Sequence, residues 1–201
     1  MSLSRSAAFA FAAGLVLSAC VSVLPETQAP APRFTLDAPT LRFDGVPVTA
    51  TIAVERPSSL AALDTTAVAI VKDGYRVAYH RNLEWSDRAP RLVETMIVRT
   101  LENTDLFPNA GRRTKVGAAR YRLHTDIRAF EQVDEPERAA RIALRVSLLD
   151  TRSGDIVGAL LIDELEPLDG RDAALIHAFD RANDRAMEKV AAFISESAGA
   201  R

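Results

Sequence analysis

The side chains that could do chemistry are scattered along this sequence of 201 residues. Its three histidines, His80, His124 and His177, lie on three different predicted elements, and no two stand at metal-ligand spacing. The pairs Asp134-Glu135 and Asp163-Glu164 could serve acid–base catalysis, but each adjoins a predicted turn or strand end, where charges are usually solvated. No nucleophile elbow or glycine-rich phosphate loop is present. We therefore expect no catalytic residue, no metal site and no cofactor, and predict that the chain is not an enzyme.

The single cysteine, Cys20, ends a pattern that is typical of protein export. An apolar run from Ala7 to Leu17 follows Arg5, and Leu17-Ser18-Ala19-Cys20 closes it. The run is about 11 residues long, whereas a membrane-spanning helix needs roughly 20, so residues 1–19 are predicted to be a cleaved signal peptide.

The closing tetrapeptide resembles the lipobox of bacterial lipoprotein precursors. The resemblance implies that Cys20 is lipidated, carries fatty acyl chains such as palmitate, and becomes the first residue of the mature chain. The alternative for Cys20 is an ordinary buried thiol. A disulfide within the chain is excluded because there is no second cysteine.

Composition separates a tether from one folded domain. Residues 20–32 contain Pro25, Pro30 and Pro32, which prevent a regular helix, so they are predicted to form a tether about 35 Å long. Residues 33–201 are then expected to fold as one domain with a substantial core. The formal net charge of -2 argues against a nucleic-acid partner, because such a partner requires a clear basic excess.

Apolar periodicity predicts an α+β domain. Asp73-Gly74 separates two alternating segments and indicates a hairpin. The expected sheet is antiparallel or mixed, and two main helices pack on one of its faces. The predicted strands cover 33–36, 46–54, 67–71, 75–79, 120–130, 141–149 and 155–162, and the predicted helices cover 86–103 and 172–195.

Two features outside catalysis are candidates for binding. Trp85 precedes the first predicted helix, within a segment that also contains Asn82. Trp85 is either a core residue at the helix start or an exposed aromatic anchor for a partner, and both residues are candidate docking positions. The basic cluster of Arg112-Arg113 and Lys115 is either plain surface or a contact for lipid headgroups or an acidic partner.

Most of the chain resembles the auxiliary lipoproteins of ABC-type transporters, a PqiC-like family associated with Mce-type lipid transport. Four segments carry the resemblance, in the family's order after the lipobox. The early strand of the family typically begins with Tyr, and this chain has Arg33 in that place. The matching segments are Arg33-Phe34-Thr35-Leu36, 63–71, 79–87 and Tyr121-Arg122-Leu123 through Phe130.

The resemblance implies a non-enzymatic role in the cell envelope. The expected partners are the membrane, through the lipid anchor, and an Mce-domain protein, a permease and an ATPase that together transport phospholipid or another hydrophobic molecule. Val21 follows Cys20, so no Asp is present there to retain the protein at the inner membrane, and the periplasmic leaflet of the outer membrane is the expected location. Self-association into a homo-oligomer stays open. The alternative is an outer-membrane assembly or chaperone-type lipoprotein of another envelope machine.

Overall fold

The computed structural model describes residues 32–40, 45–168 and 172–199, which lie within one compact unit, Ala31–Arg201. Over the described residues this unit is a single α+β domain with nine strands and two helices, and the periodicity predicts this fold class. The predicted signal peptide, Cys20 and nearly all of the predicted tether lie outside the described residues. The helices are α2 (Ala89–Glu102) and α3 (Asp172–Gly199). The strands are β1 (Arg33–Phe34), β2 (Ile52–Val54), β3 (Ser58–Ser59), β4 (Ala67–Lys72), β5 (Arg76–Trp85), β6 (Ala110–Arg112), β7 (Tyr121–Val133), β8 (Ala139–Asp150) and β9 (Ile156–Pro167).

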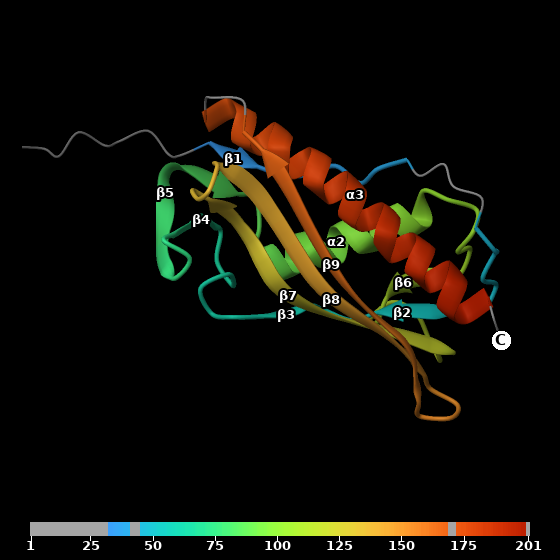
Figure 1. Ribbon diagram of the computed structural model, residues 1–201. Coiled ribbons are helices and arrows are strands. Elements are labelled where there is room, and N and C mark those ends of the chain that lie inside the picture. The colour runs from blue at the N-terminus through green and yellow to red at the C-terminus, as the bar shows by residue number, and fades with distance from the viewer. Residues whose placement is uncertain (1–31, 41–44, 169–171, 200–201) are drawn as a thin grey trace, which may run out of the picture. The chain divides into compact units, whose positions relative to one another are not determined.

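The long strand β7 organises the sheet (Figure 1). One of its edges pairs with β8 along the whole strand, and β9 follows β8 in an antiparallel meander. Its other edge pairs in turn with the short parallel strands β2, β3 and β4. Beyond them, β6 pairs with β2 near one end of β7, and β5 followed by β1 lies outside β4 near the other end. The mixed sheet therefore has β9 as its outer strand on one side, and the short strands β1, β3 and β6 with the unpaired part of β5 on the other.

The predicted hairpin is confirmed at its turn. Asp73 and Gly74 have φ angles of 52° and 75°, so both central residues adopt left-handed backbone conformations. Two successive positive φ angles match the right-handed twist of paired strands, and Asp-Gly tolerates them better than most dipeptides. The turn places Val77 opposite Val71 on the paired strands.

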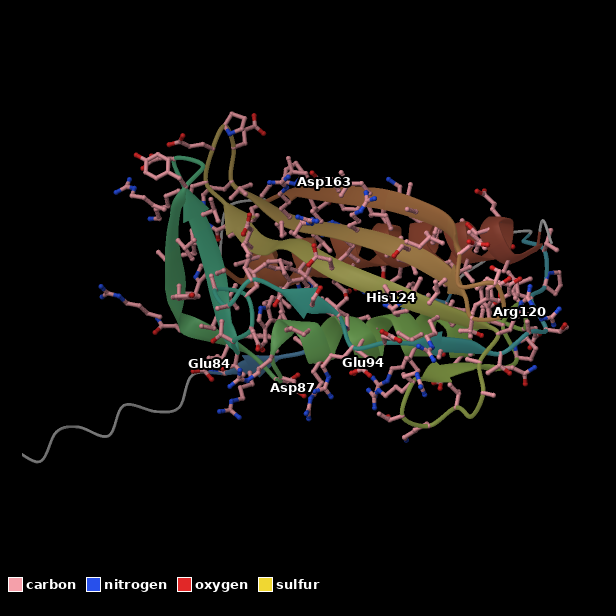
Figure 2. The ribbon with its side chains drawn as sticks, turned by 90° about the horizontal axis from the view of Figure 1, so that it is seen from below. Glu84, Asp87, Glu94, Arg120, His124 and Asp163 are labelled. Atoms are coloured by element: carbon pink, nitrogen blue, oxygen red, sulfur yellow. The ribbon has the colours of Figure 1, made fainter. Side chains whose placement is uncertain are left out.

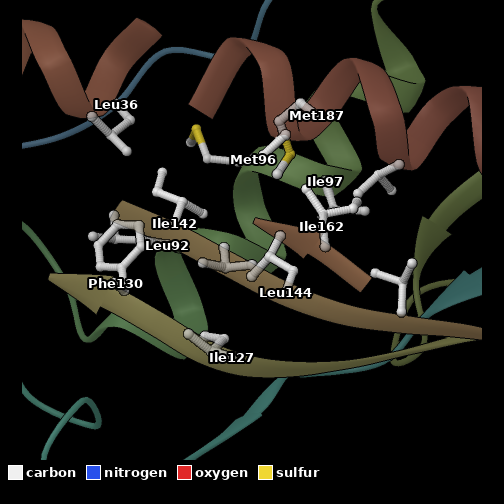
Figure 3. Close-up of a cluster of buried hydrophobic side chains, with 14 of the residues drawn as sticks. Leu36, Leu92, Met96, Ile97, Ile127, Phe130, Ile142, Leu144, Ile162 and Met187 are labelled. Atoms are coloured by element: carbon white, nitrogen blue, oxygen red, sulfur yellow. The ribbon is translucent and has the colours of Figure 1, made fainter. Parts of the chain in front are cut away.

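Both helices pack on one face of the sheet and enclose the core (Figure 3). Along α2, Leu92, Met96 and Ile97 are buried, which confirms the apolar stripe expected of this helix. They meet strand residues such as Ile142 and Leu144 of β8, and Ala143 between these two is buried as well. No helix in the described ranges is both long and apolar enough to cross a membrane.

Three aromatic rings join β5, β7 and α3 inside this core. Trp85 is 1% exposed, and its ring centroid lies 5.0 Å from that of Phe130 and 4.9 Å from that of Phe179. Phe130 and Phe179 are 5.4 Å apart. Tilted and edge-on rings at these separations add roughly 1 kcal/mol per pair to the benefit of burial.

A β-bulge in β7 changes which residues reach this core. Strict alternation predicts Ala129 on the same face as Ile127, but the pairing with β8 shifts between them, so Arg128 is an extra residue. Beyond the bulge, Phe130 takes the helix-covered face opposite Ile142. The aromatic cluster exists because of this one-residue shift.

Several predicted boundaries also need correction. The strand expected over 75–79 runs from Arg76 to Trp85, and the one expected over 33–36 ends at Phe34. The strand expected over 46–54 is regular only at 52–54, because Pro47 interrupts it and the Val48 N–H donates to the Leu106 carbonyl. Strand β9 extends to Pro167 rather than ending at 162. Helix α2 starts at Ala89, later than the expected residue 86, because β5 continues through Trp85. The Trp85 N–H donates to the Thr66 carbonyl, as a strand residue would.

Candidate functional site

The three histidines have separate surroundings, and none of them contacts another. His80 Nε2 lies 3.0 Å from the side-chain oxygen of Gln132, and His124 Nδ1 lies 3.0 Å from a Glu55 carboxylate oxygen. His177 is exposed on α3. Across the described ranges, no three His, Cys, Asp or Glu residues come together as a metal site would require.

The carboxylates Asp163 and Glu164 point to opposite faces of β9. Both were expected at a strand end among solvated charges, but they lie within β9 and are ion-paired. Asp163 forms a two-pronged pair with Arg141, at 2.9 and 2.7 Å, and this hydrogen bonding lowers the pKa of Asp163. Glu164 turns toward α3. The two groups therefore cannot act together on one substrate.

Glu164 belongs to what we call the α3–β9 ion cluster, formed by Glu164, Glu166, Arg181, Arg185 and Lys189. Glu164 is 7% exposed and accepts from Arg185 at 2.9 Å and from Lys189 at 2.5 Å. Glu166 accepts from Arg181 at 2.5 Å and from Arg185 at 2.7 Å. Hydrogen bonding with Arg181, reinforced by Arg185, lowers the pKa of Glu166. Every cation here has a carboxylate, which indicates a structural clasp between helix and strand.

A second charged cluster surrounds a hollow of about 920 Å³ between α2 and the β2–β6 edge of the sheet. We call this hollow the basic cleft. Asp87 and Glu94 lie on the same side of α2, along the cleft (Figure 2). Its cations come from three separate parts of the chain. They are Arg56 after β2, Arg91 on α2, Arg112 on β6, and Arg113 and Lys115 in the loop that follows β6.

A buried carboxylate holds two of these arginines in place. The side chain of Glu94 is 8% exposed, and its oxygens lie 3.5 Å from Arg56 Nε and 3.7 Å from Arg112 Nε. Arg112 also donates to Thr95 Oγ1 at 2.7 Å, and the Thr95 hydroxyl donates to the Arg91 carbonyl at 2.8 Å. Arg112 Nε is buried and makes no hydrogen bond. These contacts hold Arg112 in the wall of the cleft, and its Nε–H group is left without a hydrogen-bond acceptor.

The loop after β6 is held against the neighbouring strand. The Arg113 N–H donates to the Val54 carbonyl at 2.8 Å, and the Lys115 N–H donates to the Arg112 carbonyl at 2.8 Å. Gly111 allows the loop to fold back, because a Cβ atom there would lie 2.8 Å from a Val116 methyl carbon. These backbone contacts keep Arg113 and Lys115 beside the cleft.

The two predicted docking residues differ in their exposure to solvent. Trp85 lies in the core, so its burial supports the core interpretation rather than the exposed anchor, and it does not meet the basic cleft. Asn82, three residues earlier on β5, is exposed. Cys20 lies outside the described residues. Of the residues that line the basic cleft, the sequence singles out only Arg112, Arg113 and Lys115.

The outer part of β5 offers a second surface. Over 76–83 no described strand pairs with its outer edge, since β1 joins it only at Glu84 and Trp85. The hairpin also exposes three large apolar residues, namely Tyr75, Val77 and Tyr79. An open edge beside exposed apolar residues is a template for the addition of another strand.

The fold and these surfaces define an α+β domain with a helix-covered sheet and an open strand edge. The chain belongs to the ABC-type transport auxiliary lipoprotein component family, whose model matches residues 34–191. A curated relative, the uncharacterized protein bll6063 of Bradyrhizobium diazoefficiens, is 30% identical over 158 residues, or 77% of this chain. The match covers 42% of the length of that relative.

Solved structures show the same fold. The crystal structure of protein XCC0632 from Xanthomonas campestris has a TM-score of 0.73 at 20% identity and covers 85% of this chain and 95% of its own. Protein CT253 from Chlamydia trachomatis, a hypothetical protein, has a TM-score of 0.51 at 12% identity, covering 76% of this chain and 100% of its own. At these identities the likeness concerns the fold alone.

Proposed function

We propose that this protein is a lipid-anchored, non-catalytic component of an ABC/Mce-type system that transports lipid between the two membranes of the envelope. The observation that carries the proposal is the family match over residues 34–191. In the proposed arrangement, an Mce-domain protein, a permease and an ATPase form the transporter, and this domain docks on it from the membrane.

The anchoring part of the proposal rests on the sequence before the described domain. Residues 1–19 would be removed, Cys20 would carry the lipid, and residues 20–32 would tether a domain that spans 33–201. Val21 in place of an Asp favours the periplasmic leaflet of the outer membrane. This arrangement places the domain within about 35 Å of one membrane surface.

We further propose β5 as the docking strand. Its unpaired edge over 76–83 provides backbone N–H and C=O groups, Tyr75 and Val77 supply apolar contact, and Asn82 adds a polar side chain. When a partner adds a strand to a sheet edge, main-chain hydrogen bonds provide the affinity and contacts of alternate side chains provide the specificity. The occupant would be an extended segment of the Mce-domain partner.

The test is recovery of the partner with the anchored protein. Affinity purification from membranes in mild detergent should recover the Mce-domain protein, and Val77→Lys should reduce this recovery at least fivefold. Ile156→Lys, a change of another exposed apolar residue on β9, is the matched control and should leave recovery unchanged. Absence of every transporter component from the wild-type purification would refute the proposed function, and a loss with Ile156→Lys alone would refute β5 as the docking strand.

Cys20→Ala tests the anchor separately. The variant should leave the membrane fraction and lose function, while its melting temperature stays within about 2 °C of the wild type, because the altered residue precedes the folded domain. Retention of the variant in the membrane fraction would contradict lipid anchoring through Cys20.

A further inference from the structure

The charges around the basic cleft are unbalanced. Five cationic side chains line it against three carboxylates, Glu55, Asp87 and Glu94. Glu55 is already paired outside the cleft, since its oxygens meet His124 at 3.0 Å and Arg122 at 4.0 Å. The cleft therefore has more positive than negative charge facing its interior.

Two of the cations lack any carboxylate. Arg113 and Lys115 are exposed at the cleft and form no ion pair with any described residue. Arg56 has only the 3.5 Å contact with Glu94, which it shares with Arg112. Since an arginine presents a fork of five N–H donors, these groups have free donors that converge from β2, β6 and the following loop.

The start of α2 adds to the positive potential. The helix begins beside the cleft with Arg88 as its N-cap, which makes no side-chain capping hydrogen bond, and its first turn contains no acidic residue. The partial positive charge of this N-terminus is offset in part by Asp87, which accepts from the Arg88 N–H at 2.8 Å and pairs with Arg91 at 3.4 Å. This contribution is secondary to the converging side chains.

Such a set of donors matches a phosphate ester. Guanidinium groups that approach from different directions can each bond a different oxygen of a tetrahedral anion, and Lys115 adds a mobile point charge. A volume of about 920 Å³ also leaves room for the group that the phosphate is attached to. The negative charge of Glu94 does not prevent phosphate binding, because this carboxylate contacts Arg56 and Arg112 and orients them.

We propose that the basic cleft binds a phosphate ester, either the headgroup of a phospholipid or a small soluble molecule. Arg113 and Lys115 contact the phosphate directly, and Arg56 and Arg112, which share Glu94, complete the cradle. This proposal stands on the geometry of the cleft and does not depend on the transport role proposed above.

The experiment compares ligands that differ in their phosphate group. The protein, purified in nonionic detergent, is titrated with dioleoylphosphatidylglycerol in mixed micelles, with dioleoylglycerol as the lipid without phosphate. Glycerol 1-phosphate and glycerol form the soluble arm. We expect binding of phosphatidylglycerol but not of dioleoylglycerol, and an affinity that falls as salt rises.

Charge-matched double variants then locate the site. R113Q/K115Q should weaken phosphatidylglycerol binding at least tenfold. R81Q/R152Q removes the same charge from two exposed arginines that do not line the cleft and should change it less than twofold. Binding of glycerol 1-phosphate, lost in R113Q/K115Q, would support the site with a soluble ligand as its source.

Two results would overturn the proposal. One is equal affinity for each phosphate compound and its phosphate-free control. The other is an equal loss of affinity in R113Q/K115Q and R81Q/R152Q, which would mean that general attraction to cations explains the binding. Both double variants change exposed residues, and thermal melting checks that each remains folded.

Discussion

The α3–β9 ion cluster and the basic cleft use similar side chains with opposite outcomes. In the cluster, two carboxylates meet three cations at 2.5–2.9 Å, and each cation has a partner. In the cleft, the shortest contacts of Glu94 are 3.5 and 3.7 Å, and Arg113 and Lys115 have no carboxylate. Close, complete pairing serves the fold, whereas looser pairing with spare donors leaves capacity for a ligand.

The largest expected effect comes from removing the central carboxylate of the α3–β9 ion cluster. Glu164→Ala should lower the free energy of unfolding by about 2 kcal/mol, because hydrogen bonds to charged groups are lost, Lys189 is left without a carboxylate and Arg185 keeps only Glu166. Urea unfolding measures this change. Glu196→Ala, at an exposed position of α3, is the control and should cost less than about 0.5 kcal/mol.

The matching change in the cleft should cost less. Glu94→Ala is expected to lower the free energy of unfolding by about 1 kcal/mol, since its pairs are longer and Arg56 is largely exposed. Urea unfolding beside Glu164→Ala gives the comparison directly. A cost greater than that of Glu164→Ala would reverse the distinction drawn between the two clusters.

The pH dependence of the free energy of unfolding should reveal the contribution of the α3–β9 ion cluster. Because Arg181 and Arg185 lower the pKa of Glu166 in the folded state, its contribution is complete above the ordinary value of 4.5 and is lost as pH falls toward the folded pKa. The stability lost between about pH 5.5 and about pH 3.5 should therefore be smaller in Glu166→Gln than in the wild type. Glu188→Gln, an exposed control on α3, should retain the wild-type dependence.

The smallest effect on stability is expected for R113Q/K115Q, the variant that should weaken phosphate binding most. R113Q/K115Q should change the free energy of unfolding by less than about 0.5 kcal/mol, because both side chains are exposed and unpaired. Chemical denaturation of this variant without ligand tests the point. A loss of more than 1 kcal/mol, roughly, would give these residues a structural role and weaken the contrast with the α3–β9 ion cluster.

Local patterns in the sequence predicted much of the fold. Asp73-Gly74 predicted a hairpin because few dipeptides adopt two successive positive φ angles, and the apolar stripe of α2 predicted its buried face. Each of these features depends on neighbouring residues alone. The α+β architecture followed from the order of such elements.

The bulge and the cleft depend on contacts that periodicity does not encode. Nothing in the alternation of β7 reveals that Arg128 is an extra residue and that Phe130 therefore reaches Trp85. The loop cations Arg113 and Lys115 stood out as a cluster in the sequence. Arg56, far from them in the chain, reaches the same cleft only because β2 pairs with β6 in parallel.

The short strand β1 has a mechanical consequence. The Glu84 N–H donates to the Pro32 carbonyl and the Ser86 N–H to the Phe34 carbonyl, so the chain enters the domain through bonds that flank Trp85. A pull along this strand, applied before Pro32, loads these bonds together in shear instead of breaking them one after another. Tension in the preceding chain would therefore reach β5 and the aromatic core directly, at the strand that carries the open edge.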